Sequence, residues 1–213
     1  MQTQKTKTEK QLQAGVFVDA SNTYFSEKRA GWKIDYQKLQ DFLSEEMQVS
    51  FIKYYVAIPK KTDTQAYEGK INYLEKLRNT VEIIEKPLKY IRENIKIEDK
   101  IISRIIKKGD VDVDITVDVL NNLKDLDIVI ILSGDSDYLA LRDDIIKKGK
   151  KILFMARKRN LSHEIRQGKY VILQSLKKYI IYTKGENETP TSKGGGTLVD
   201  ILYSRDKKLS TLN

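Results

Sequence analysis

Residues 128–138 read Ile-Val-Ile-Ile-Leu-Ser-Gly-Asp-Ser-Asp-Tyr, a short continuous apolar run that ends in a polar loop. A run of this length without alternation is typical of a strand that is buried on both faces of a parallel sheet. The loop contains a glycine and two carboxylates, which favour the start of a helix near Tyr138. The stretch therefore predicts one strand-loop-helix unit, with Asp135 and Asp137 at the carboxyl end of its strand.

Similar units recur on both sides of this stretch. Strand-like apolar runs occupy residues 14–18, 49–58, 81–84 and 151–155, and helical patterns lie between them. Asp35 is expected to cap the first of two amphipathic helices, whereas residues 86–100 give no clear pattern. Strands that alternate with helices predict an α/β fold around a mainly parallel sheet. The apolar positions at helical spacing are Leu39, Phe42, Leu43 and Met47, then Tyr67, Ile71, Leu74 and Leu77.

The composition is that of a basic, cysteine-free protein. In 213 residues, 39 Lys and Arg against 30 Asp and Glu give a net charge of +9, which favours a polyanionic partner such as nucleic acid. Solubility alone is the simpler interpretation of that charge. The absence of cysteine excludes disulfides and thiolate metal sites, and it is compatible with a reducing compartment. We expect a cytoplasmic protein.

The chain is expected to hold one domain. A polar tail covers residues 1–13, and the α/β domain covers residues 14–181. Residues 182–213 form a flexible linker, with Pro190 and three consecutive glycines, and a short C-terminal tail. No apolar run approaches the roughly 18 residues of a membrane span, so no membrane partner is expected. The sequence leaves the oligomeric state open, a homodimer included.

Two aspartates follow predicted strands directly. Asp19 follows the run at 14–18 and Asp135 the run at 128–132, and ligands of open α/β sheets bind at the carboxyl ends of strands. Each loop alone has a simpler explanation, because Asp19 or Ser21 can cap one helix and Ser136 or Asp137 the other. Capping by one residue leaves the neighbouring carboxylate unexplained, and oxygen-only clusters suit Mg²⁺ or Mn²⁺.

A third acidic cluster lies at residues 110–118. Its apolar residues alternate with polar ones, a period that by itself predicts a strand. For the acids themselves, a functional cluster and a solvated acidic face are equally good interpretations. On a helix, Asp114 and Asp118 would share a face, whereas Asp112 and Asp118 would not. The single histidine, His163, excludes a ribonuclease that uses two imidazoles as general acid and base. The acids of the cluster are Asp110, Asp112, Asp114 and Asp118.

Three motifs in this order resemble the NYN domain, LabA-like branch, of the PIN-like nuclease superfamily. They are Val-Phe-Val-Asp19-Ala-Ser-Asn22, Lys108-Gly-Asp-Val-Asp112 with Asp118, and Ser133-Gly-Asp-Ser-Asp-Tyr138. The resemblance covers about residues 14–181. It implies a Rossmann-like, PIN-like three-layer fold with about five to six strands, and it places residues 111–124 on a helix, against the alternation.

The same resemblance implies a metal-dependent ribonuclease and its site residues. Asn22 would support Asp19 or hold water or phosphate, and Asp118 would have a supporting role. The family commonly reads Lys-Gly-Val-Asp, whereas Asp110 is inserted here, so Asp110 or Asp114 competes with Asp112 for the helix position. The implied ligands of one or two Mg²⁺ or Mn²⁺ ions are Asp19, Asp112, Asp135 and Asp137, and the implied catalytic set adds Asn22 and Asp118.

RNA, single-stranded or structured with accessible strands, is the expected partner, and the resemblance implies products with 5′-phosphate and 3′-hydroxyl ends. Tyr54 and Tyr55 are expected in the core, whereas Tyr90 is a candidate for stacking on bases. An RNA-binding adaptor without turnover is the alternative function. A haloacid dehalogenase-type phosphohydrolase would need Asp-x-Asp where this chain has Asp19-Ala-Ser21. Candidate phosphate contacts are Lys107, Lys108, Lys147, Lys148, Arg157, Lys158 and Arg159.

Overall fold

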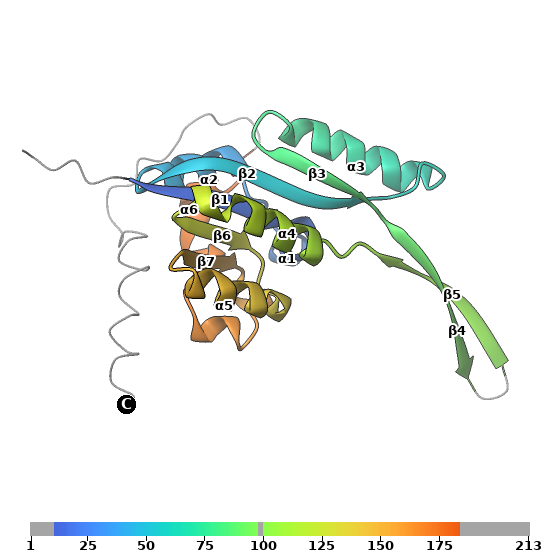
Figure 1. Ribbon diagram of the computed structural model, residues 1–213. Helices are drawn as coiled ribbons and strands as arrows, with labels where there is room; N and C mark the ends of the chain where they lie inside the picture. The colour runs from blue at the N-terminus through green and yellow to red at the C-terminus, as the bar shows by residue number, and fades with distance from the viewer. Residues whose placement is uncertain (1–10, 98–99, 184–213) are drawn as a thin grey trace, which may run out of the picture.

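The structure is a computed structural model that describes residues 11–97 and 100–183. Six strands form one parallel sheet in the order β3-β2-β1-β6-β7-β8, flanked by helices (Figure 1). This is the expected three-layer α/β fold. The strands are β1 (Leu12–Asp19), β2 (Met47–Ile58), β3 (Glu82–Pro87), β6 (Ile128–Leu132), β7 (Lys151–Ala156) and β8 (Tyr170–Ile172). The helices are α1 (Ala20–Ala30), α2 (Tyr36–Ser44), α3 (Thr64–Leu77), α4 (Asp112–Asn122), α5 (Leu139–Lys147) and α6 (Lys177–Ile180).

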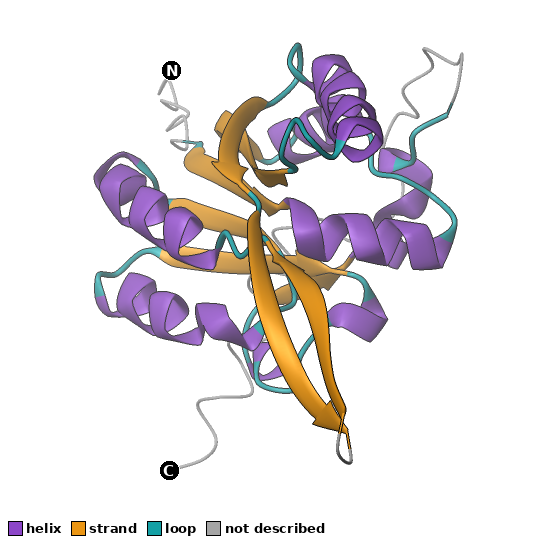
Figure 2. Cartoon of the chain, turned by 90° about the vertical axis from the view of Figure 1, so that its right-hand side faces the viewer, coloured by secondary structure: helices purple, strands orange, loops and turns teal. Residues whose placement is uncertain are grey.

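The sheet separates two apolar cores. Val16 and Val18 of β1 pack on one side with residues of α2, α3 and α6, whereas Phe17 packs on the other side with residues of α4 and α5. Successive side chains of a strand point to opposite faces, so β1 supplies both cores. Helices therefore cover both faces of the sheet (Figure 2).

The strand order changes direction at the middle of the sheet, although all six strands are parallel. From β1 the chain first adds β2 and β3 on one side, and then crosses over to β6, β7 and β8 on the other. The carboxyl ends of β1 and β6 thus flank the topological switch point, where open α/β sheets bind their ligands.

A two-stranded antiparallel hairpin, β4 (Lys89–Ile97) and β5 (Lys100–Lys108), continues from the carboxyl end of β3. It extends away from the body of the domain (Figures 1 and 2). Ile101 and Ile105 on it are 72% and 62% exposed. The sequence left most of this segment unassigned.

Residues 112–122 form helix α4, as the family resemblance implied, so the strand that alternation predicts is wrong. Val111, Ile115 and Val119 are buried at i, i+4 and i+8, while Val113 and Val117 are 72% and 52% exposed. Every second residue of an alternating segment also includes every fourth, which is one face of a helix. The alternation contained a complete helical face.

Other boundaries differ in detail from the expected ones. The helix capped by Asp35 ends at Ser44, and Met47 begins β2 instead of extending that helix. Leu12 belongs to β1 and not to the polar tail. At the other end Ile181 bridges to Ile34. Residues 1–10 of the predicted N-terminal tail and 184–213 of the predicted linker lie outside the described residues.

Tyr54 and Tyr55 are 2% and 1% exposed, which confirms their predicted place in the core. Within the described ranges, no helix is long and apolar enough to cross a membrane.

Candidate active site

Asp19 ends β1 and caps α1. Its Oδ1 accepts hydrogen bonds from the backbone N–H groups of Ser21 and Asn22, at 2.9 and 3.0 Å, and from the Ser21 hydroxyl at 2.8 Å. The capping interpretation is thus confirmed, and Asn22 contacts Asp19 through its backbone. All three capping bonds use Oδ1, so the cap leaves the lone pairs of Oδ2 available to other partners.

Ser133 joins the ends of β1 and β6. Its hydroxyl donates to Asp19 Oδ2 at 3.2 Å and accepts from the Asp135 backbone N–H at 3.3 Å. Asp135 in turn accepts from the Asp137 backbone N–H at 3.1 Å and so caps the short helix Ser136–Tyr138. The prediction that Ser136 or Asp137 would cap is therefore wrong. The Asp137 side chain is exposed, whereas Asp135 is half-buried.

Tyr138 brings α4 to these two loops. Its side chain is fully buried, and its hydroxyl donates to Asp112 Oδ1 at 2.9 Å. Burial raises the pKa of Tyr138 most, and the nearby carboxylates of Asp19, Asp112 and Asp135 raise it further. Burial also raises the pKa of Asp112, against the Tyr138 hydrogen bond, and Asp19, Asp135 and Asp110 add to the rise. The carboxylates of Asp19 and Asp135, from two other parts of the chain, therefore lie close enough to act on Asp112 and on Tyr138.

The donors around Tyr138 fit a small divalent cation. Carboxylate oxygens are the preferred ligands of Mg²⁺ and Mn²⁺. Burial raises the pKa of Asp112 most, and a cation would offset the repulsion from Asp19 and Asp135 that raises it further. Across the described residues, no three Asp, Glu or His side chains converge closely enough to enclose a metal ion by themselves. Mg²⁺ commonly uses one or two protein carboxylates and completes its shell with water and substrate phosphate.

The other acids of the cluster at residues 110–118 pair with other groups. Asp114 pairs with Lys86, and Asp110 pairs with Lys108 at 2.8 Å. Asp118 pairs with Lys53 of β2 at 2.8 Å and also accepts hydrogen bonds from Tyr55 and Asn122. The structure thus brings Asp112 to Asp19 and Asp135, and it does not bring Asp118 there.

The role of Asp118 is testable through its pH dependence. Burial raises the pKa of Asp118, but hydrogen bonds from Lys53 and Tyr55 outweigh it, and the net pKa is lowered. A lowered pKa in the folded state means that the stabilisation is complete above the unfolded value of about 3.9 and is lost as pH falls through the folded value. We expect Asp118→Asn to lower the free energy of unfolding by about 1–2 kcal/mol at pH 7, and by little near pH 2.

Urea denaturation between pH 7 and pH 2 measures this difference. The matched control is Asp143→Asn, because Asp143 pairs with its neighbour Arg142 while 66% exposed, and such surface pairs contribute little. A loss at Asp118 that stays constant over the whole pH range would contradict the assignment.

Gly134 allows the loop after β6 to touch the loop after β7. A Cβ atom there would lie 2.2 Å from the Asn160 carbonyl oxygen and 2.9 Å from the Leu161 Cα, so backbone would have to move. The Ser162 N–H also donates to the Gly134 carbonyl at 2.9 Å. We expect Gly134→Ala to destabilise the protein by about 1–3 kcal/mol, as overpacked sites do.

Chemical denaturation of Gly134→Ala beside Gly69→Ala tests this contact. A Cβ at Gly69, within α3, meets nothing within 4 Å, and alanine there should stabilise by about 0.5–1 kcal/mol. Equal stability of the two variants would show that the two loops do not touch as described.

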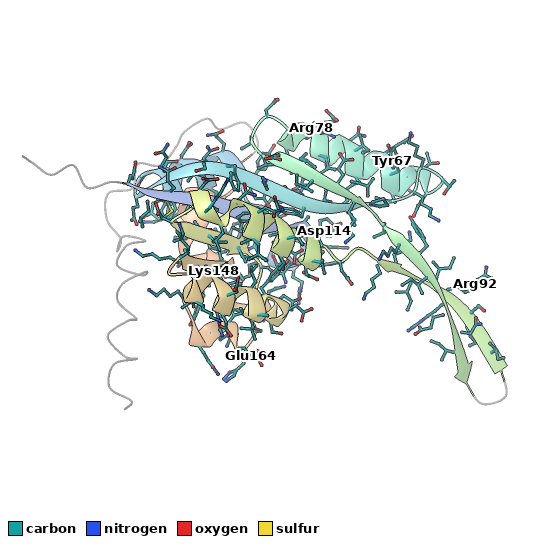
Figure 3. All side chains as sticks on the ribbon, viewed as in Figure 1. Tyr67, Arg78, Arg92, Asp114, Lys148 and Glu164 are labelled. Atoms are coloured by element: carbon teal, nitrogen blue, oxygen red, sulfur yellow. The ribbon has the colours of Figure 1, made fainter. Side chains whose placement is uncertain are left out.

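The predicted phosphate contacts have different outcomes. The prediction for Arg157 is wrong, because its side chain is 2% exposed. Its Cζ atom lies 3.7 Å from the Trp32 ring centroid, and its Nη2 donates a hydrogen bond to the Trp32 carbonyl. Lys147 and Lys148 lie at the far end of α5, about 13 Å along the helix from its start near Asp135. Figure 3 shows Lys148 there, well away from Asp114.

Four of the predicted phosphate contacts remain compatible with that role. Lys158 and Arg159 are exposed beside Asn160, whose backbone contacts Gly134. Lys107 and Lys108 are exposed at the base of the hairpin and pair with aspartates.

Two residues of the site, Ser133 and Tyr138, belong to a motif found in the sequence, but no role was predicted for them. Ser133 and Tyr138 flank Gly-Asp-Ser-Asp and hold Asp19 and Asp112 in place. A serine before the loop and an aromatic residue after it are common in many loops, so only the folded arrangement reveals these contacts.

Comparison with known proteins places this arrangement in a family. The NYN domain family matches residues 13–174, a span that includes all three motifs. The chain is 21% identical over 171 residues to the Low amplitude and bright protein LabA of Synechococcus elongatus, covering 79% of this chain and 88% of that protein. It is also similar to a crystal structure of a protein of unknown function from Vibrio parahaemolyticus, with a TM-score of 0.58 and 26% identity over 81% of this chain and 95% of that one. The chain therefore belongs to the NYN domain family, which is generally nuclease-like.

Proposed function

We propose that this protein is a metal-dependent endoribonuclease that hydrolyses phosphodiester bonds in single-stranded RNA or in accessible strands of structured RNA. The observation that carries the proposal is a pair of links: Ser133 joins Asp19 to the backbone of Asp135, and the Tyr138 hydroxyl holds Asp112 close enough to both for their charges to act on it. These groups lie at the switch point of the sheet, where ligands of such folds bind.

The residues of the site hold the carboxylates in fixed positions. The cap of α1 and Ser133 orient Asp19, the Tyr138 hydroxyl orients Asp112, and the backbone of the short helix orients Asp135. One or two of Asp19, Asp112 and Asp135 would bind Mg²⁺ or Mn²⁺ directly, and the others, with the exposed Asp137, would bind the ion through its water ligands. When bound, the cation would supply positive charge that lowers the pKa of water and offsets charge developing on the phosphate.

Charge outside the site supports an RNA substrate. The chain carries a net charge of +9, and Lys158 and Arg159 lie exposed next to the loop that bears Asp135. Cations near a scissile phosphate attract and position a polyanionic strand. Membership of the nuclease-like NYN family supports the same substrate class.

The test is a time course on RNA labelled at one end, with Mg²⁺, Mn²⁺ or EDTA. We expect internal cleavage with either metal, 5′-phosphate and 3′-hydroxyl product ends, and no cleavage in EDTA. A circular RNA of the same sequence should be cut as well, because an endonuclease needs no free end. RNA binding without cleavage in every metal would favour the adaptor function instead.

A further inference from the structure

A cavity of about 440 Å³ lies beside the candidate active site, between α1, α3, the end of β2 and the base of the hairpin. We call it the α1 pocket. Ala20 and Ser21, which follow Asp19, line it, and so does Asp110, two residues before Asp112. The volume is within the range of small-molecule sites, about 300–1,000 Å³. A ligand in the α1 pocket would therefore lie next to the proposed metal ligands.

The wall of the α1 pocket contains two exposed aromatic rings. Tyr24 and Phe25 of α1 are 47% and 58% exposed, and their ring centroids lie 5.5 Å apart at an angle of 72°. Val56, Ala57 and Leu88 add apolar surface. Aromatic rings left exposed around a cavity are typical of a surface that contacts a ligand.

A lysine side chain lies beside these rings. Lys70 Nζ is 5.4 Å from the Tyr24 ring centroid, and among the described residues no carboxylate pairs with Lys70. Its side chain is half-buried, and this burial lowers its pKa. Lys107 and Lys108 line the same cavity, but each pairs with an aspartate. Lys70 is thus the lysine of the α1 pocket that is placed to meet an anionic ligand.

We propose that the α1 pocket binds one unpaired nucleotide of the RNA substrate, with its base on Tyr24 and Phe25 and its phosphate near Lys70. Bases of unpaired strands stack on aromatic side chains, whereas bases of a duplex already stack on each other. The α1 pocket therefore selects unpaired strands and positions them against the neighbouring carboxylates. This inference rests on the proposed function, since it assigns a pocket to one nucleotide of the RNA that the same site would cut.

Fluorescence anisotropy in EDTA, where no cleavage is expected, measures this binding without turnover. The Tyr24→Ala and Phe25→Ala double variant should bind labelled single-stranded RNA about 10- to 100-fold more weakly than wild type. Its affinity for a duplex of the same sequence should equal that of wild type. Tyr24→Phe, which keeps the ring, should bind normally. The control is Tyr182→Ala, because Tyr182 is 53% exposed but does not line the cavity.

A scan of abasic RNA identifies the nucleotide. Removing one base next to the cleavage position should weaken binding to wild type and leave binding to the double variant unchanged. Lys70→Met should reduce the slope of log affinity against log salt by about one, as the loss of one phosphate contact does. Circular dichroism verifies that the variants are folded.

The possible outcomes separate the two proposals. If the double variant binds single-stranded RNA as tightly as wild type, the α1 pocket does not bind a nucleotide, even when wild type cuts RNA in Mn²⁺. An equal loss of affinity for duplex RNA also overturns it, because the rings would then not discriminate by base stacking. Base-dependent binding at the α1 pocket without cleavage in any metal would support the proposed nucleotide pocket and contradict the proposed nuclease activity.

Discussion

Asp112→Asn is expected to lower metal-dependent RNA cleavage about 100- to 1,000-fold, the usual cost of removing one group that stabilises developing charge. We choose Asp112 among the acids of α4 because it alone accepts a hydrogen bond from the Tyr138 hydroxyl and lies near Asp19 and Asp135. Loss of its charge removes one proposed cation ligand.

Asp114→Asn is the matched control for this prediction. Asp114 lies on the same helix two residues away but pairs with Lys86, and surface pairs contribute only about 0–1 kcal/mol to stability. Initial cleavage rates at a fixed Mn²⁺ concentration measure the difference. Asp112→Asn with wild-type rates beside an inactive Asp114→Asn would show that the helix position belongs to Asp114.

Tyr138→Phe is expected to raise the Mn²⁺ concentration for half-maximal cleavage about 10- to 100-fold, as the loss of groups that orient metal ligands does. The Tyr138 hydroxyl donates to Asp112 Oδ1 at 2.9 Å from a fully buried position. Phenylalanine keeps the ring in the core and removes only the hydrogen bond. Asp112 would then adopt other rotamers and bind the cation less tightly.

Tyr55→Phe provides the comparison, since the Tyr55 hydroxyl also donates to an aspartate of α4, in this case Asp118. Its ring is 1% exposed and packs in the same core as Tyr138. The Mn²⁺ dependence of Tyr55→Phe should remain that of wild type. The same shift in both variants would mean that general loosening of the core, and not the orientation of Asp112, controls the metal response.

Much of the fold follows from local patterns in the sequence. The run at 128–132 is buried over its whole length, and Asp35 caps the helix that its position predicts. The acidic segment at 111–119 shows the limit of such patterns, because its alternation satisfies a strand and a helix equally. Packing against the sheet decides in favour of the helix, since Val111, Ile115 and Val119 lie in the same core as Phe17 and Val129 of the strands.

The candidate site was predictable as a set of residues and not as an arrangement. The sequence placed Asp19 and Asp135 at strand ends, but their link through Ser133 depends on the pairing of β1 with β6, 114 residues apart. Arg157 follows a strand as a phosphate contact would, yet Trp32 covers it. A contact with so distant a residue has no local signal in the sequence.

The most direct test of the proposed metal site compares wild type, Asp19→Asn and Asp135→Asn on the same labelled single-stranded RNA, with Mn²⁺ and with EDTA. We expect wild type to cut the RNA with Mn²⁺ and not with EDTA, and neither variant to cut it although both remain folded. Cleavage that survives EDTA and both substitutions would contradict the claim that these aspartates hold the catalytic metal.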